Sequence, residues 1–268
     1  MYVGLTSDQH VGSAFAMWPA GAKLSSGGTY KPNKGQRYVL RNWQRIAQEI
    51  PDLDVLVFAG DGIDGKQPKE RGRYIIEPEP LVQARALVAA AQPYWARIRP
   101  GGSIYVLRGT GYHDDDDSAM EWFGAEVGAM PDEAGHHAWD WLLLQCEGVL
   151  LDIAHTQSWT MRYQSMPLER EGQFSDMAGL QADVIVRAHT HVAHWQYMEG
   201  ANRLPMRLEV SLPAWQLQTA YAKGSRIPNR MLSRNLGMVV LDVQRDWVGV
   251  LPFLFPHPKQ RRVKVVTT

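Results

Sequence analysis

Five short polar motifs each follow a hydrophobic run in this chain, and their side chains are of the kinds that bind metal ions. They are Asp8-Gln9-His10, Gly60-Asp61-Gly62-Ile63-Asp64, Gly111-Tyr112-His113-Asp114, His155, and Ala188-His189-Thr190-His191. Residues i and i+2 of an extended segment point the same way, so Asp8 and His10 can face one ion, and the imidazoles of His189 and His191 point in one direction. Carboxylate oxygen combined with imidazole nitrogen suits Mn, Fe, Ni or Zn better than Ca or Mg. The spacing therefore predicts metal binding at the ends of several strands.

The strongest of these hydrophobic runs, residues 53–59, has the pattern of a buried strand in a parallel sheet. Such a strand carries Asp61 to the carboxyl edge of the sheet, where open α/β folds place their chemistry. The pattern predicts four further strands that precede the other motifs: residues 2–7, 103–107, 148–154 and 182–186. Helical spacing of apolar residues predicts helices over 36–49, 79–97 and 118–128, the second ended by Pro100-Gly101-Gly102.

Beyond residue 138 the pattern becomes richer in strands. Runs 139–146 and 148–154 predict a hairpin that turns at Glu147-Gly148. A loop and a short helix are expected over 160–180. Further strands are expected at 206–212, 237–243 and 246–253, which we assign to a mixed second layer.

Two polar stretches lack regular patterning and follow candidate ligands. Residues 11–34 form a long loop with the aromatic residues Phe15, Trp18 and Tyr30, which we interpret as a wall beside the substrate. Residues 65–78 carry four cations and are expected to be a solvated loop, with contact to a phosphate as the alternative: Lys66, Lys69, Arg71 and Arg73.

Composition limits the classes of protein to which the chain can belong. Its 268 residues carry 28 basic and 28 acidic side chains, so no net charge draws it to nucleic acid or membrane. No apolar run approaches the ~18 residues of a membrane span, and the start of the sequence does not have the pattern of a secretion signal. The single cysteine, Cys146, is expected to be a buried and inert thiol, so a cytoplasmic location is expected.

Taken together, the five motifs resemble those of the calcineurin-like metallophosphoesterase superfamily, whose blocks are D-x-H, G-D-x-x-D, G-N-H-D/E, a lone His and G-H-x-H. The resemblance implies an α/β fold, a four-layer α/β/β/α sandwich with two mixed sheets flanked by helices, in one domain over residues 1–268. It also implies that Asp61 bridges two metal ions and that His113, the second catalytic residue, lies near the scissile phosphate. The metal ligands that it implies are Asp8, His10, Asp61 and His191 for one ion, and Asp61, His155 and His189 for the other.

The chain departs from the family pattern at three places. The asparagine of the third block is replaced by Tyr112, or by Thr110 if the turn is longer by two residues. Ala188 stands where the family has glycine, and Gly65 where it often has arginine. The Gly-Thr-x-x-His form is similar to a phage- or prophage-type branch of the superfamily.

The function that follows from the resemblance is hydrolysis of phosphodiester bonds, with a nuclease-like activity included, by attack of a metal-bridging hydroxide. Two divalent cations ~3.5–4 Å apart lower the pKa of a bridging water and clamp the phosphoryl oxygens. Mn²⁺ is the expected ion, with Fe, Ni or Zn as alternatives, and the expected partners are phosphate esters such as nucleotides or single-stranded nucleic acid. The alternatives are a phosphomonoesterase or protein phosphatase, and a non-catalytic binding or scaffold protein.

Overall fold

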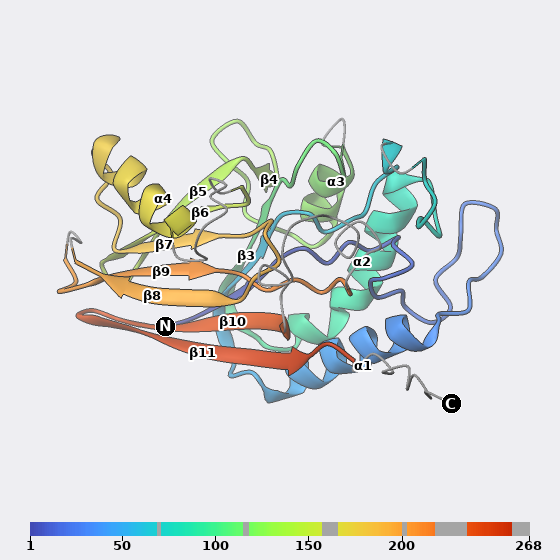
Figure 1. Cartoon of the computed structure of the whole chain (residues 1–268), viewed down its shortest axis with the longest axis horizontal. Coiled ribbons are helices and arrows are strands. Elements are labelled where there is room, and N and C mark those ends of the chain that lie inside the picture. Colours follow the sequence, from blue (N-terminus) through green and yellow to red (C-terminus); the bar gives the residue numbers. More distant parts are fainter. Residues whose placement is uncertain (69–70, 115–117, 157–165, 200–202, 218–234, 259–268) are drawn as a thin grey trace, which may run out of the picture.

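The computed structural model describes residues 1–268 except 69–70, 115–117, 157–165, 200–202, 218–234 and 259–268 (Figure 1). Its helices are α1 (Lys34–Glu49), α2 (Pro80–Trp95), α3 (Ser118–Glu126) and α4 (Met166–Met177). The helix starts follow local chemistry. Asn33 and Gln36 form a reciprocal capping box on α1, α2 begins with Pro80, and the carboxylate of Asp114 accepts the Met120 N–H in the first turn of α3.

The first sheet contains six strands in the order β11-β10-β1-β2-β3-β4. Strands β1 to β4 run parallel, while β10 and β11 are antiparallel additions at the β1 edge. The bounds are β1 Tyr2–Thr6, β2 Leu53–Ala59, β3 Ile98–Leu107, β4 Ala138–Trp139, β10 Asn235–Gln244 and β11 Trp247–Pro256.

The second sheet contains five strands in the order β5-β6-β7-β9-β8. Strands β6, β7 and β9 are parallel, and the edge strands β5 and β8 are antiparallel to their neighbours. The bounds are β5 Trp141–Cys146, β6 Val149–Ala154, β7 Val184–Arg187, β8 His194–Met198 and β9 Arg207–Ser211.

Two hydrophobic cores hold these layers together. Along β2, Leu56 and Phe58 face a core shared with α1, α2 and α3, whereas Val55 and Val57 face a core between the two sheets. Burial on both faces explains the unbroken apolar run of this strand. Helix α4 contacts β7 and β9 on the other side of the second sheet (Figure 1). The four-layer α/β/β/α sandwich with two mixed sheets is confirmed.

Three sequence expectations about the strands were wrong. Strands β10 and β11 join the first sheet, because β10 pairs with β1 and not with the second layer. The run 139–146 is divided at Asp140, where the chain passes from β4 in one sheet to β5 in the other. Residues 100–102 do not end a helix. They lie within β3, where the pairing with β2 shifts register. Strand β8 was not predicted.

Other expectations are confirmed. Glu147 and Gly148 both have positive φ, 48° and 84°, as the tight turn between β5 and β6 requires. Cys146 is buried, and burial raises the pKa of its thiol to about 11. None of the helices in the described part of the chain has the length and apolar character needed to cross a membrane.

Some residues that the sequence patterns single out lie outside the described residues. They are Lys69, Asp115 to Asp117, and the lysine- and arginine-rich segment 259–264.

Candidate metal centre

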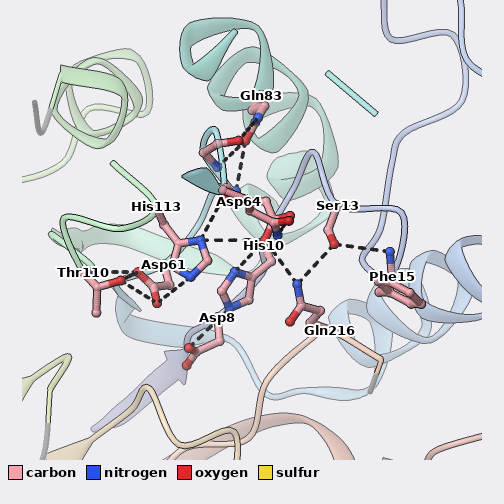
Figure 2. A network of polar contacts seen from close by, with 12 residues as sticks. Asp8, His10, Ser13, Phe15, Asp61, Asp64, Gln83, Thr110, His113 and Gln216 are labelled. Carbon is pink, nitrogen blue, oxygen red and sulfur yellow. Dashed lines mark hydrogen bonds and ion pairs between the residues drawn. The ribbon is translucent and has the colours of Figure 1, made fainter. Parts of the chain in front are cut away.

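The five motifs come together where strands of both sheets end. β1, β2 and β3 deliver Asp8, Asp61 and His113 from the first sheet, and β6 and β7 deliver His155 and His189 from the second. Main-chain hydrogen bonds join these ends to one another: the Asp8 N–H donates to the Gly60 carbonyl, and the Ala188 N–H donates to the His155 carbonyl. Figure 2 shows the part of the cluster around His10, Asp61 and His113.

The expected ligand atoms form groups compact enough for metal ions. Asp8, His10 and His191 make one group, and Asp61, His155 and His189 make another, each with its ligand atoms within 4.8 Å of one another. His191 Nε2 lies 3.1 Å from Asp8 Oδ1 and from His10 Nε2. His155 Nε2 lies 2.9 Å from Asp61 Oδ2. A further group of His10, Asp61 and His113 links the two, so Asp61 stands between them.

The backbone at the candidate ligands is strained. Asp8, His10, Asp61, His189 and His191 have φ between 46° and 68°, and they make up five of the nine non-glycine residues with positive φ in the described segments. Such conformations cost roughly 1–3 kcal/mol each and cluster at functional sites. The fold thus accepts unfavourable backbone geometry to aim these side chains at one place.

The buried carboxylates and imidazoles at the centre stabilise one another's charged forms. Burial opposes ionisation of Asp8 and Asp61, but the charges of His191 and His155 respectively hold the pKa of each carboxyl well below its usual range. Burial also disfavours a charge on His10, yet the carboxylates of Asp64 and Asp8 raise its pKa to about 10.

Two atoms of this buried cluster are suited to binding a cation. Asp8 Oδ1 and His155 Nε2 are buried and make no hydrogen bond of good geometry within the described residues. Their nearest polar neighbours are other candidate ligands, His191 Nε2 at 3.1 Å and Asp61 Oδ2 at 2.9 Å respectively. A cation would complete the coordination of both atoms, and the mixed oxygen and nitrogen donor set suits Mn, Fe, Ni or Zn.

Three of the histidines, His10, His113 and His155, are held through the ring nitrogen Nδ1. His155 Nδ1 lies 2.7 Å from the Ala59 carbonyl, which can only accept, so Nε2 is left as the metal-facing atom. His10 Nδ1 lies 3.2 Å from the carboxylate of Asp64, and His113 Nδ1 lies 2.9 Å from the Asp64 carbonyl. Such supports fix the tautomer and orientation of metal-binding imidazoles.

Asp64 is itself held by glutamines that no sequence motif indicated. Gln216 donates to Asp64 Oδ1 at 3.2 Å, and Gln67 donates to Oδ2. Gln83 Oε1 accepts the Asp64 N–H at 3.0 Å (Figure 2). Asp64 belongs to a recognised motif, but the contact with Gln216 joins residues far apart in the chain, so local spacing gives no signal for it.

The long loop 11–34 forms less of a substrate wall than expected. Trp18 is fully buried in the core with α1, and Tyr30 packs against the same core. Phe15 is half-buried, and the centroid of its ring lies 5.2 Å from that of Tyr74, a residue of the loop 65–78. The Arg73 guanidinium lies over the Tyr74 ring, 5.6 Å from its centroid. This aromatic pair, Phe15 and Tyr74, therefore comes from both loops.

The structure also distinguishes the two residues that could replace the family's asparagine. The Thr110 N–H donates to Asp61 Oδ1 at 2.7 Å, and the Thr110 hydroxyl lies 3.2 Å from the same oxygen. Tyr112 instead contacts the ring of His113, at 5.0 Å between centroids. Thr110 is the residue beside the central carboxylate.

No family model matches the sequence, and no curated protein matches it. Among solved structures, the chain is similar to an archaeal phosphodiesterase at 11% identity and a TM-score of 0.47, over 94% of this chain and 99% of the other. It is also similar to the purple acid phosphatase PPD1 of yellow lupin at 14% identity and a TM-score of 0.45, over 90% and 49%. A predicted phosphoesterase of Streptococcus pneumoniae is similar at 12% identity and a TM-score of 0.39, over 94% and 89%.

Proposed function

We propose that this protein is a calcineurin-like metallophosphoesterase that hydrolyses phosphodiester bonds with two divalent metal ions. Mn²⁺ is the ion that we propose in preference to Fe, Ni or Zn. Asp8, His10, Asp61 and His191 would hold one ion, and Asp61, His155 and His189 the other. The observation that carries the proposal is the pair of mostly buried ligand groups, one of which contains Asp61 and is linked to the other through the contact of Asp61 with His10. Bound there, the ions would acidify a water molecule and neutralise charge on the phosphoryl oxygens.

His113 is placed to act on the phosphate ester. Its Nδ1 faces the Asp64 carbonyl and must carry the hydrogen of that contact, so Nε2 is the nitrogen that gains or loses a proton. Nε2 lies 3.8 Å from Asp61 Oδ2, on the side of the candidate ligands. Protonated, Nε2 can donate to a departing alkoxide or to a phosphoryl oxygen, which typically contributes ~10²–10⁴-fold to a rate.

A diester preference is supported by the surface beside the centre. The Ala14 N–H donates to the Tyr74 carbonyl at 2.8 Å, so the half-buried rings of Phe15 and Tyr74 are held together a few residues beyond His10. The two rings meet edge to face, with 61° between their planes, and offer apolar contact to an organic group on phosphorus. Because the net charge is zero, small or single-stranded diesters are the proposed substrates in preference to duplex nucleic acid.

The proposal is tested by assaying metal-depleted protein with and without Mn²⁺ on bis-p-nitrophenyl phosphate and p-nitrophenyl phosphate. Mn²⁺-dependent turnover with the higher kcat/KM on the diester is expected. The variant Asp61→Ala should be inactive, and Asp246→Ala, which removes an exposed carboxylate between β10 and β11, should behave as wild type. A higher kcat/KM on the monoester would overturn the diester preference, and no turnover on either compound would overturn the enzymatic function.

A further inference from the structure

The turn after β3 encloses one oxygen of the central carboxylate. Asp61 Oδ1 accepts the Thr110 N–H at 2.7 Å and the Thr110 hydroxyl at 3.2 Å (Figure 2). A Cβ atom on Gly109 would lie 2.0 Å from Oδ1 and 2.4 Å from the Asp61 nitrogen. Only glycine at position 109 lets the turn come this close, so Gly109 and Thr110 together form a cradle for Oδ1.

The other oxygen of Asp61 faces the candidate ligands. Oδ2 lies 2.9 Å from His155 Nε2, and 3.8 Å from both His189 Nδ1 and His113 Nε2. The Thr110 hydroxyl lies 3.5 Å from Oδ2, which is farther than its distance from Oδ1. The two oxygens of one carboxylate are therefore assigned separate tasks. Oδ1 is held by the protein, and Oδ2 faces the candidate ligands.

Thr110 also sets the position of His113. Its carbonyl accepts the His113 N–H at 2.9 Å, which closes the turn that carries the imidazole toward Asp61. One residue therefore links the orientation of the Asp61 carboxylate to the placement of His113.

We infer that Thr110 is a positioning residue that fixes the Asp61 carboxylate with Oδ2 turned toward the candidate ligands. The inference rests on the proposed function. The Thr110 hydroxyl donates to the Asp61 carboxylate, at 3.2 Å from Oδ1 and 3.5 Å from Oδ2, so it replaces the family's asparagine in position but not as a metal ligand. The second ion would then have three protein ligands, Asp61, His155 and His189.

The test compares Thr110→Val, which removes the hydroxyl but keeps the shape and the N–H, with Thr110→Ser, which keeps the hydroxyl. Calorimetric titration of the metal-free protein with Mn²⁺ measures the affinity of each step. Loss of an outer hydrogen bond to a ligand typically costs about 10–100-fold in metal affinity or activity, so Thr110→Val should weaken the second step by at least about tenfold. Thr110→Ser should restore binding to within about twofold of wild type, since its hydroxyl can make the same hydrogen bond.

In the same series, kcat for bis-p-nitrophenyl phosphate should fall in Thr110→Val while KM changes little. The exposed surface variant Asp246→Ala should match wild type in both measurements, and Tyr112→Phe tests the other residue that could replace the family's asparagine. Circular dichroism and thermal melting of each variant establish that it is folded. Wild-type affinity in folded Thr110→Val, or equal losses in the Val and Ser variants, would overturn the role of the hydroxyl, as would a loss confined to Tyr112→Phe. If wild-type protein binds no Mn²⁺, the proposed function fails, whereas two bound ions with no effect of Thr110→Val refute this inference alone.

Discussion

Metal uptake by the free protein is expected to strengthen as pH rises, because protons occupy the same imidazoles. Burial disfavours a charge on His155, yet the carboxylate of Asp61 raises its pKa to about 9, and Asp64 with Asp8 raises the pKa of His10 to about 10. A metal-binding imidazole must be neutral. Each ion therefore displaces at least one proton near neutral pH.

The size of the effect follows from these pKa values. At pH 7 the raised pKa values lie about 3 units above the pH for His10 and about 2 units for His155. Each unit corresponds to about 1.4 kcal/mol, so displacing the protons costs about 4 kcal/mol at His10 and about 3 kcal/mol at His155. The apparent affinity should rise about tenfold per pH unit for each proton released, and level off near pH 10 at His10 and near pH 9 at His155.

The assay is calorimetric titration with Mn²⁺ between pH 6.5 and 8.5, in paired buffers that differ in ionisation enthalpy. The difference between buffers gives the number of protons released, which should be at least one for each ion. Replacing His155 with Asn should remove one proton from the second step and flatten its pH dependence. Binding that releases no protons, or that is independent of pH, would refute the assignment of His10 and His155 as ligands charged in the free protein.

Two further predictions concern catalysis and stability. His113→Ala should keep its bound metal and lose roughly two or more decades of rate, with a smaller loss for nitrophenolate than for alkoxide leaving groups, which need more protonation. Equal losses for both leaving groups would remove the general-acid role. Asp152→Ala should destabilise the fold by roughly 1–3 kcal/mol in denaturant unfolding, because the buried Arg187 guanidinium, held 2.8 Å from Asp152 Oδ1, loses its bidentate partner and keeps only Glu171, 2.9 Å from its Nε. Asp246→Ala is the surface control, and a change below about 1 kcal/mol in Asp152→Ala would contradict the importance of this ion pair.

The elements around the centre could be predicted because their sequence patterns are local. Strand β2 is apolar from Val55 to Ala59 since Val57 faces one core and Phe58 the other, and its end fixes the position of Asp61. The spacing of Asp8 with His10 correctly predicted that both side chains lie in one group, although both residues have positive φ and are not extended. These features need no knowledge of distant contacts.

The remaining features depend on contacts between distant segments. A strand such as β10, which is apolar and buried along most of its length, looks the same whichever sheet it joins, and its pairing with β1 decides the matter. Trp18 lies in a long loop without regular patterning, and the loop packs its indole into the core. Gln216 reaches Asp64 only because the segment after β9 returns to the first loop, where the Leu217 N–H donates to the Phe15 carbonyl.

The arrangement of two ions on either side of Asp61 is tested most directly by anomalous diffraction from a crystal of the Mn²⁺-loaded protein. Two peaks ~3.5–4 Å apart are predicted. One should lie among Asp8, His10 and His191, and the other between His155 and His189, with Asp61 Oδ2 contacting both. A single peak, or two peaks that do not share Asp61, would contradict the proposed centre.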